Sequence, residues 1–392
     1  MKPRSWWALL IALPLLLAVC WLVLGNESDR SPIAAVHTLR AGDETLRLAS
    51  EGGFDVVVQV FSWLEIEPTR EEWHWEYPDF VVRAAEHYGL DLIVRLDGLP
   101  AWAAEEAAAG QADKLSDDYA VFVGTVAQRY RGQIRGYIVW NEPNLAKEWV
   151  GRPPDPAAYT ELLRRAYEAI KAAAPEATVV SAGLASTNHQ DDKAMDDRVF
   201  LEAMYQAGAR AHFDALGAHP YGFAYPPDDP RSAHDGLNLA RLLDLREIME
   251  AHGDGDKPVW VTELGWTTAG VGESSWLTVT PQQQADYLTG AWRRAREWPW
   301  LQVFTVWNLS QGPRPEPVEG LPPMDEMAGY SLLAESGEPK AAYDALQTEL
   351  NRRWGHRLAR WVDRTQVALL DPVPSVVTIL ATDEAVHLGD SE

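Results

Sequence analysis

Short apolar runs, most of them rich in β-branched residues, recur along this chain, and segments with helical periodicity lie between them. Eight such runs occur between residues 33 and 307. Strands that alternate with helices at this spacing predict a parallel sheet with helices packed outside it, and eight units are enough to close the sheet into a (β/α)8 TIM barrel. The expected strands are residues 33–36, 54–60, 90–96, 134–140, 178–183, 213–218, 258–262 and 301–307.

The segments between these runs carry helix boundary signals. Ser116 and Thr280 are expected N-caps, and Pro281 suits the first position of a helix because it has no N–H to lose. An acidic, alanine-rich stretch at 105–113 is expected at the surface. The expected helices are residues 43–51, 78–88, 116–130, 156–173 and 237–251, with one more beginning at Pro281.

Two of the expected strands end in a glutamate. The run that begins at Ile138 stops at Asn141-Glu142, where Pro143 cannot continue a ladder, and a second run stops at Glu263. The carboxyl ends of parallel strands carry the site in an α/β barrel. One such glutamate is more often a solvated loop residue or half of an ion pair, but two together supply the carboxylates that cleavage of a glycosidic bond requires.

The Asn-Glu-Pro motif at 141–143 and the second strand-terminal glutamate resemble those of the clan A glycoside hydrolases, nearest to families 5 and 39. The resemblance extends from about residue 33 to 350. It implies a retaining β-glycosidase that acts on a β-linked oligo- or polysaccharide, with Glu142 as general acid/base and Glu263 as nucleophile. Burial and the neighbouring negative charge are expected to keep the pKa of Glu142 high. Which glutamate has which role follows from the resemblance and not from spacing.

The resemblance also implies a set of sugar-binding residues. Asn141 would bond the 2-hydroxyl of the sugar, and Tyr221 of the His219-x-Tyr221 pattern would orient the nucleophile, while His219 itself is more often structural. Trp307 would be the platform beneath that sugar. Without the resemblance, an Asx turn, a packed tyrosine and a core tryptophan are the ordinary readings of these residues. The candidates for outer subsites, with core packing as the even alternative, are Trp63, Trp102 and Trp266.

One position departs from the clan's pattern. Many members end strand two with an arginine that holds the charge of the nucleophile, whereas this chain has Val58-Gln59-Val60 there. Arg95, near the end of the third expected strand, either reaches in from the adjacent strand or pairs with Asp97 without a catalytic role.

Composition and motif content argue against several other functional classes of protein. A net charge of −24 leaves no Lys/Arg excess for nucleic acid, and the single cysteine, Cys20, rules out a disulfide framework or a thiolate metal cluster. An H-x-H metal-ligand pattern is also missing, which argues against a metal-dependent amidohydrolase. We therefore expect neither a metal nor another cofactor. A catalytically silent barrel that binds polysaccharide remains the alternative, and sugar, linkage and oligomeric state cannot be read from the sequence.

The two ends of the chain lie outside the expected barrel. The uncharged apolar run at 6–24 follows Lys2 and Arg4, which predicts a signal anchor within residues 1–25 and a barrel, residues 26–350, outside the cytoplasm. A cleaved signal peptide and secretion are the competing reading. Residues 351–392 are expected to form a further helix and a possible strand. The proline-rich stretch 311–327 is either a lid or a disordered flap.

Overall fold

A computed structural model describes residues 31–108, 112–149, 151–229, 231, 236–270, 277–311 and 324–352. The chain divides into two units, Met1–Arg352 and Arg353–Glu392, and every described residue belongs to the first. The apolar run at 6–24, most of the stretch 311–327 and nearly all of the extension 351–392 lie outside the described residues. Among those that are described, no helix is both long enough and apolar enough to cross a membrane.

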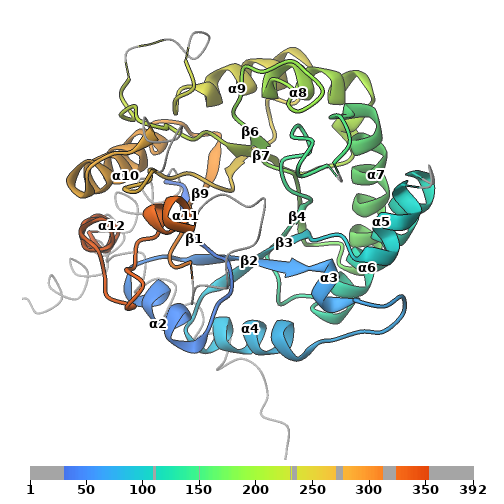
Figure 1. Ribbon diagram of the computed structural model, residues 1–392, viewed down its shortest axis with the longest axis horizontal. Helices are drawn as coiled ribbons and strands as arrows, with labels where there is room; N and C mark the ends of the chain where they lie inside the picture. The colour runs from blue at the N-terminus through green and yellow to red at the C-terminus, as the bar shows by residue number, and fades with distance from the viewer. Residues whose placement is uncertain are drawn as a thin grey trace, which may run out of the picture. The chain divides into compact units, whose positions relative to one another are not determined.

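Nine parallel strands form one sheet that curls into an α/β barrel of the TIM type (Figure 1). Their order is β5-β4-β3-β2-β1-β9-β8-β7-β6, so strands that follow each other along the chain are paired in the sheet, except β5 and β6. β5 and β6 are two parts of the fifth barrel strand, and a parallel bridge between Val180 and Ala215 joins β5 to the segment before β7. The strands are β1 Ile33–Thr38, β2 Val56–Ser62, β3 Asp91–Asp97, β4 Gly136–Val139, β5 Thr178–Ser181, β6 Leu184–Ala185, β7 Leu216–His219, β8 Val259–Val261 and β9 Leu301–Val306.

The strands are apolar on both faces because both faces are covered. One cluster fills the barrel interior, and a larger one lies between the sheet and the helices. Trp260 is the large side chain of the interior. A Cβ added to Gly136, on β4, would lie 2.8 Å from the Trp260 ring, so the indole needs glycine at that position. The interior cluster consists of Ala35, Val56, Val58, Ile93, Ile138, Val180, Ala215, Trp260 and Val303.

Helices surround the strands in Figure 1. The longer ones are α2 Asp43–Glu51, α4 Glu76–His87, α5 Ala101–Ala108, α6 Ala112–Arg129, α7 Pro156–Ala173, α8 Asp197–Gln206, α9 Arg241–Ala251, α10 Pro281–Ala295 and α12 Ala341–Asn351. Short helices are α3 Trp63–Ile66, η1 Ala209–Ala211 and α11 Met324–Tyr330.

Local sequence signals predict some helix boundaries well and miss others. The predicted helices 43–51 and 156–173 are confirmed, and Thr280 forms the expected cap as part of a capping box with Gln283. The prediction that Ser116 begins a helix is wrong, because α6 starts at Ala112 and Ser116 lies inside it. The expected surface stretch 105–113 is partly helical, and α8 was not predicted.

Candidate active site

Glu142 is placed by a sharp turn directly after β4. Trp140 and Glu142 both have positive φ angles, 73° and 38°, which are uncommon for residues with a Cβ. The Glu142 N–H donates to the carbonyl of Gly183, 3.1 Å away, which fixes the turn against the fifth barrel strand. Strained backbone of this kind concentrates at functional sites, so the turn marks Glu142 as a candidate.

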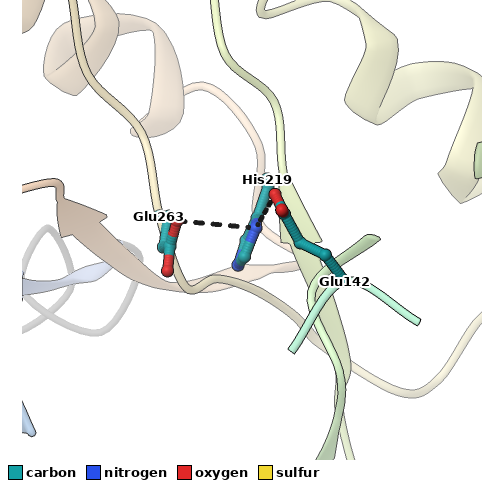
Figure 2. A group of neighbouring side chains, drawn as sticks. All are labelled: Glu142, His219 and Glu263. Atoms are coloured by element: carbon teal, nitrogen blue, oxygen red, sulfur yellow. Dashed lines mark hydrogen bonds and ion pairs between the residues drawn. The ribbon is translucent and has the colours of Figure 1, made fainter. Parts of the chain in front are cut away.

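His219, the last residue of β7, lies between the two strand-terminal glutamates (Figure 2). Its Nδ1 is 3.0 Å from Oε1 of Glu142 and 3.6 Å from Oε2 of Glu263. The three side chains each offer one ligand-type atom, and these atoms all lie within 4.8 Å of one another. The barrel therefore brings together two carboxylates whose residues are 121 positions apart (263 − 142).

Glu263 follows β8 and is held by two further donors. Tyr221 donates its hydroxyl to Oε2 of Glu263 over 2.9 Å, and the Nη1 of Arg95 forms an ion pair with Oε1. The Glu263 side chain is only 7% exposed. Both oxygens of this carboxylate thus have a partner that favours the charged form.

Arg95 on β3 both pairs with Asp97 and reaches Glu263, the two alternatives that the sequence left open. Its Nε lies 2.7 Å from Oδ2 of Asp97, while its Nη1 also donates to Oδ1 of Asn141 at 3.1 Å. Gln59, at the position where the clan pattern has its arginine, accepts from Thr38 and donates to backbone carbonyls instead. The positive charge beside Glu263 therefore comes from the third strand.

Burial and the mutual charges of this cluster shift several pKa values. Burial raises the pKa of the Glu263 carboxyl, although His219 and Arg95 oppose the rise. Burial also acts to raise the pKa of Glu142, but the hydrogen bond and charge of His219 outweigh it and bring that pKa below its ordinary value. The pKa of the buried His219 is raised, since the two carboxylates outweigh desolvation. The expected high pKa of Glu142 is therefore wrong, because that expectation did not take the His219 imidazole into account.

Trp307 directly follows β9 and lies beside the same cluster. The centroid of its ring is 5.9 Å from the Arg95 guanidinium carbon and 4.6 Å from the His37 ring, which it meets edge-on. The ring of Tyr330 lies 5.8 Å, centroid to centroid, from the ring of Tyr221, whose hydroxyl donates to Glu263. An aromatic wall therefore borders the carboxylates.

Two of the three tryptophans expected at outer subsites are in the core, which corrects the expectation for them. Trp63 and Trp266 are both 0% exposed, with Trp63 stacked on Phe122 and Trp266 donating to the Tyr225 carbonyl. Side chains of helices cover both rings: Phe122 of α6 stacks on Trp63, and the ring of Tyr287 of α10 lies 5.7 Å from that of Trp266. Trp102 is half-buried and has the Arg70 guanidinium 4.1 Å from its ring centroid, so its subsite role remains a prediction.

Comparison with known proteins shows which solved structures share this fold. No protein-family model matches this sequence, and no curated protein matches it. Among solved structures, a family 39 glycoside hydrolase from Bacteroides cellulosilyticus WH2 is 21% identical with a TM-score of 0.62, covering 82% of this chain and 64% of that one. A GH5_18 variant from Streptomyces cattleya, in complex with Manβ1-4GlcNAc, is 20% identical with a TM-score of 0.60, covering 83% and 81%. Xylanase 10B from Thermotoga maritima is 16% identical with a TM-score of 0.55, covering 83% and 97%.

This barrel has the fold of the clan A glycoside hydrolases. The fold expected from the Asn-Glu-Pro motif is thereby confirmed. The identities of 16–21% establish the fold alone, and the chain spans less than two thirds of the family 39 enzyme.

Two polar residues of the site were missed at the sequence level. Glu148 accepts from Nδ2 of Asn141 at 3.3 Å, and nothing in its loop sequence marks it. His37 is 1% exposed, and neither ring nitrogen has a hydrogen-bond partner among the described residues. Inward-facing residues alternate along a strand, so Ile33 and Ala35 in the interior indicate that His37 faces inward as well.

Proposed function

We propose that this protein is a retaining β-glycosidase that hydrolyses O-glycosidic bonds of a β-linked oligo- or polysaccharide. The observation that carries the proposal is the pair Glu142 and Glu263, whose facing atoms lie within 4.8 Å of each other at the carboxyl ends of β4 and β8. Retaining enzymes hold their carboxyl groups about 5–5.5 Å apart, whereas inverting enzymes need roughly 6.5–9.5 Å to admit a water molecule between them and the sugar.

The chemistry proceeds in two displacements. Glu263 attacks the anomeric carbon while Glu142 gives its proton to the glycosidic oxygen, so the bond to the leaving sugar breaks and a glycosyl ester forms on Glu263. A water molecule then attacks the same carbon as Glu142 removes its proton, and Glu263 leaves as a carboxylate. Two inversions at one carbon return the sugar with its original configuration.

The contacts of each glutamate support the assignment of roles. Glu263 receives the Tyr221 hydroxyl and the Arg95 guanidinium, both of which stabilise the anion that must attack and later leave. Among the described residues, no lysine or arginine forms an ion pair with Glu142, whose side chain is 14% exposed against 7% for Glu263. An acid that must reach a leaving group benefits from that exposure.

His219 accounts for the low pKa of the proposed acid. One proton between Nδ1 of His219 and Oε1 of Glu142 can reside on either atom across their 3.0 Å contact, so the pair titrates as a unit. When the proton is on Oε1, Glu142 is the acid that the first step needs. A charged His219 with an ionised Glu142 is the other distribution of the same proton.

Hydrolysis of a panel of aryl β-glycosides and β-linked oligosaccharides by the full-length protein tests the proposal. We expect cleavage of at least one substrate with the β-anomer released first, observed by proton NMR. Glu263→Gly should be inactive and should form a glycosyl azide when azide is added, whereas Glu142→Gly should keep activity only on substrates with a good leaving group. A panel without turnover, combined with a glycan-dependent change in tryptophan fluorescence, would instead indicate a silent binding barrel.

We also propose that the apolar run at 6–24 anchors the barrel outside the cytoplasmic membrane. The support is the length of that run and the basic residues Lys2 and Arg4 before it. Fractionation of cells that express the full chain should recover it with membranes at its full mass. Recovery of a shorter chain from the medium would show a cleaved signal peptide instead.

A further inference from the structure

We propose that Glu142, His219 and Glu263 form a binding site for Zn²⁺, and that the bound ion blocks the active site. The inhibitory consequence rests on the proposed function, because it requires these carboxylates to be catalytic. Binding of the ion does not depend on it. The site combines one imidazole nitrogen with two carboxylate oxygens, and Figure 2 shows all three directed at one another.

The spacing of the donor atoms fits a small tetrahedral ion. Zn²⁺ binds nitrogen and oxygen at about 2.0–2.2 Å, which places neighbouring tetrahedral ligands roughly 3.4 Å apart. Nδ1 of His219 is 3.0 Å from Glu142 and 3.6 Å from Glu263, on either side of that value. The separation of the two carboxylate atoms is at most 4.8 Å, so a modest rotation of one side chain completes a three-ligand set. A water molecule would supply the fourth ligand.

The surroundings already orient the ligands. Oε2 of Glu263, the oxygen nearer to His219, accepts from Tyr221, while Arg95 contacts the other oxygen. The guanidinium therefore opposes a cation by its charge without occupying the oxygen that the ion would use. One buried and one partly exposed carboxylate offset the charge of a divalent ion, and hydrogen bonds to ligands of this kind strengthen metal sites in general.

The donor set also predicts which ions bind. An imidazole nitrogen with two carboxylates suits Zn²⁺, whereas Mg²⁺ and Ca²⁺ prefer six or more oxygen ligands. Three side chains that include an imidazole supply too few oxygen ligands for that shell, so water would have to provide the rest. We therefore expect selectivity for zinc over magnesium and calcium, and mutual exclusion between the ion and the sugar that must lie between the same carboxylates.

Isothermal titration of the full-length protein with zinc chloride tests the site directly. We expect one ion per chain in the wild type, and binding at least about tenfold weaker in Glu142→Gln and in His219→Asn. Glu142→Gln is nearly isosteric and partly exposed, which keeps the test valid if the His219 variant does not fold. His74→Asn is the matched control, because it removes an exposed histidine that lies 3.5 Å from Glu72 and should leave the affinity unchanged.

Inhibition is measured separately on a substrate that the wild type cleaves. Zinc should raise KM without lowering kcat, a chelator should restore the rate, and magnesium or calcium should have no effect. Equal zinc affinity in the wild type and both site variants would overturn the zinc site while leaving the glycosidase proposal intact. Loss of activity on chelation alone would overturn the inhibitory role. Zinc binding in a protein that cleaves nothing would keep the site and overturn the proposed function.

Discussion

Arg95 joins three acidic or amide side chains at the floor of the site. It contacts Glu263, Asp97 and Asn141, and only 9% of its surface is exposed to solvent. Arg95→Lys keeps a charge but loses the planar fork that serves several partners at once. We expect kcat to fall about 10²–10³-fold, similar to the loss of one preorganised donor. Arg47→Lys, which alters an exposed arginine paired with Glu44, should leave kcat unchanged.

Glu148 is expected to act on the substrate through Asn141. The Asn141 amide accepts from Arg95 and donates to Glu148, which fixes the direction in which its remaining N–H points. Glu148→Ala should lower kcat/KM by roughly fivefold, equivalent to about 1 kcal/mol for a hydrogen bond to a partly exposed carboxylate. The loss should disappear on a 2-deoxy substrate if the effect reaches the sugar at its 2-hydroxyl.

The neighbouring Lys147 provides the control for that experiment. Its Nζ lies 3.7 Å from Oε1 of Glu148, and its side chain is 71% exposed. Lys147→Ala changes the charge near Glu148 without touching Asn141. An equal loss in this variant, or the same loss on both substrates, would contradict a role of Glu148 through Asn141.

His219 gives the site a testable pH dependence. Burial acts to raise the pKa of Glu142, and the hydrogen bond and charge of His219 lower it. A general acid must be protonated, so activity falls as pH rises through the pKa of this group. Glu142 and His219 share one proton, so the alkaline limb of the wild type reports loss of that proton from the pair. In His219→Asn the carboxyl alone must hold the proton, which should move the alkaline limb of the kcat/KM profile to lower pH. A limb that stays in place would show that His219 does not control this proton.

At the level of the elements, Gly183 separates the two halves of the fifth barrel strand to make room for His219. A Cβ added there would lie 2.2 Å from the His219 ring and 2.6 Å from Oγ1 of Thr262. Gly183→Ala should therefore displace the imidazole and destabilise the fold by about 1–3 kcal/mol, as overpacking does. We expect a lower thermal midpoint together with a larger loss of kcat. Gly42→Ala, where nothing lies within 4 Å of the added methyl, is the matched control: because Gly42 is the N-cap of α2, the change should cost at most about 1 kcal/mol and leave kcat unchanged.

Elements with local signals could be predicted from the sequence, and those set by distant contacts could not. Helix α7 was predicted to the residue because Asp155 caps it and Pro156 begins it. Helix α8 carries a similar signal in Asp196, whose side chain accepts from the Arg198 N–H, but a long polar loop before it hides the cap. The break at Gly183 depends on a histidine 36 positions away (219 − 183), which no local pattern reveals.

In the site, too, residues with local sequence signals could be predicted and those set by distant contacts could not. Glu142, Glu263, His219 and Tyr221 stand in motifs at strand ends, and the structure brings them together. Whether a tryptophan faces a cleft or the core depends on helices elsewhere in the chain. Trp63 and Trp266 could not be assigned for that reason.

For the barrel as a whole, the interior is closed beneath the site by Trp260, which is 1% exposed. Its neighbours there are small or β-branched, and Gly136 packs directly against the ring, so no nearby side chain can fill the space if the indole is lost. Trp260→Ala should cost about 3–5 kcal/mol of unfolding free energy, the range for a large buried aromatic.

The measurement is thermal unfolding of the full-length protein, with hydrolysis rates taken well below the midpoint. Trp260 belongs to the interior cluster of the barrel and does not contact either glutamate through any hydrogen bond or ion pair of the described residues. The midpoint should fall by several degrees while kcat at low temperature changes only a few-fold. Val121→Ala, on a side chain that is 61% exposed, should leave both unchanged. If kcat instead collapsed while the protein stayed folded, the interior layer would be positioning the carboxylates as well as supporting the barrel.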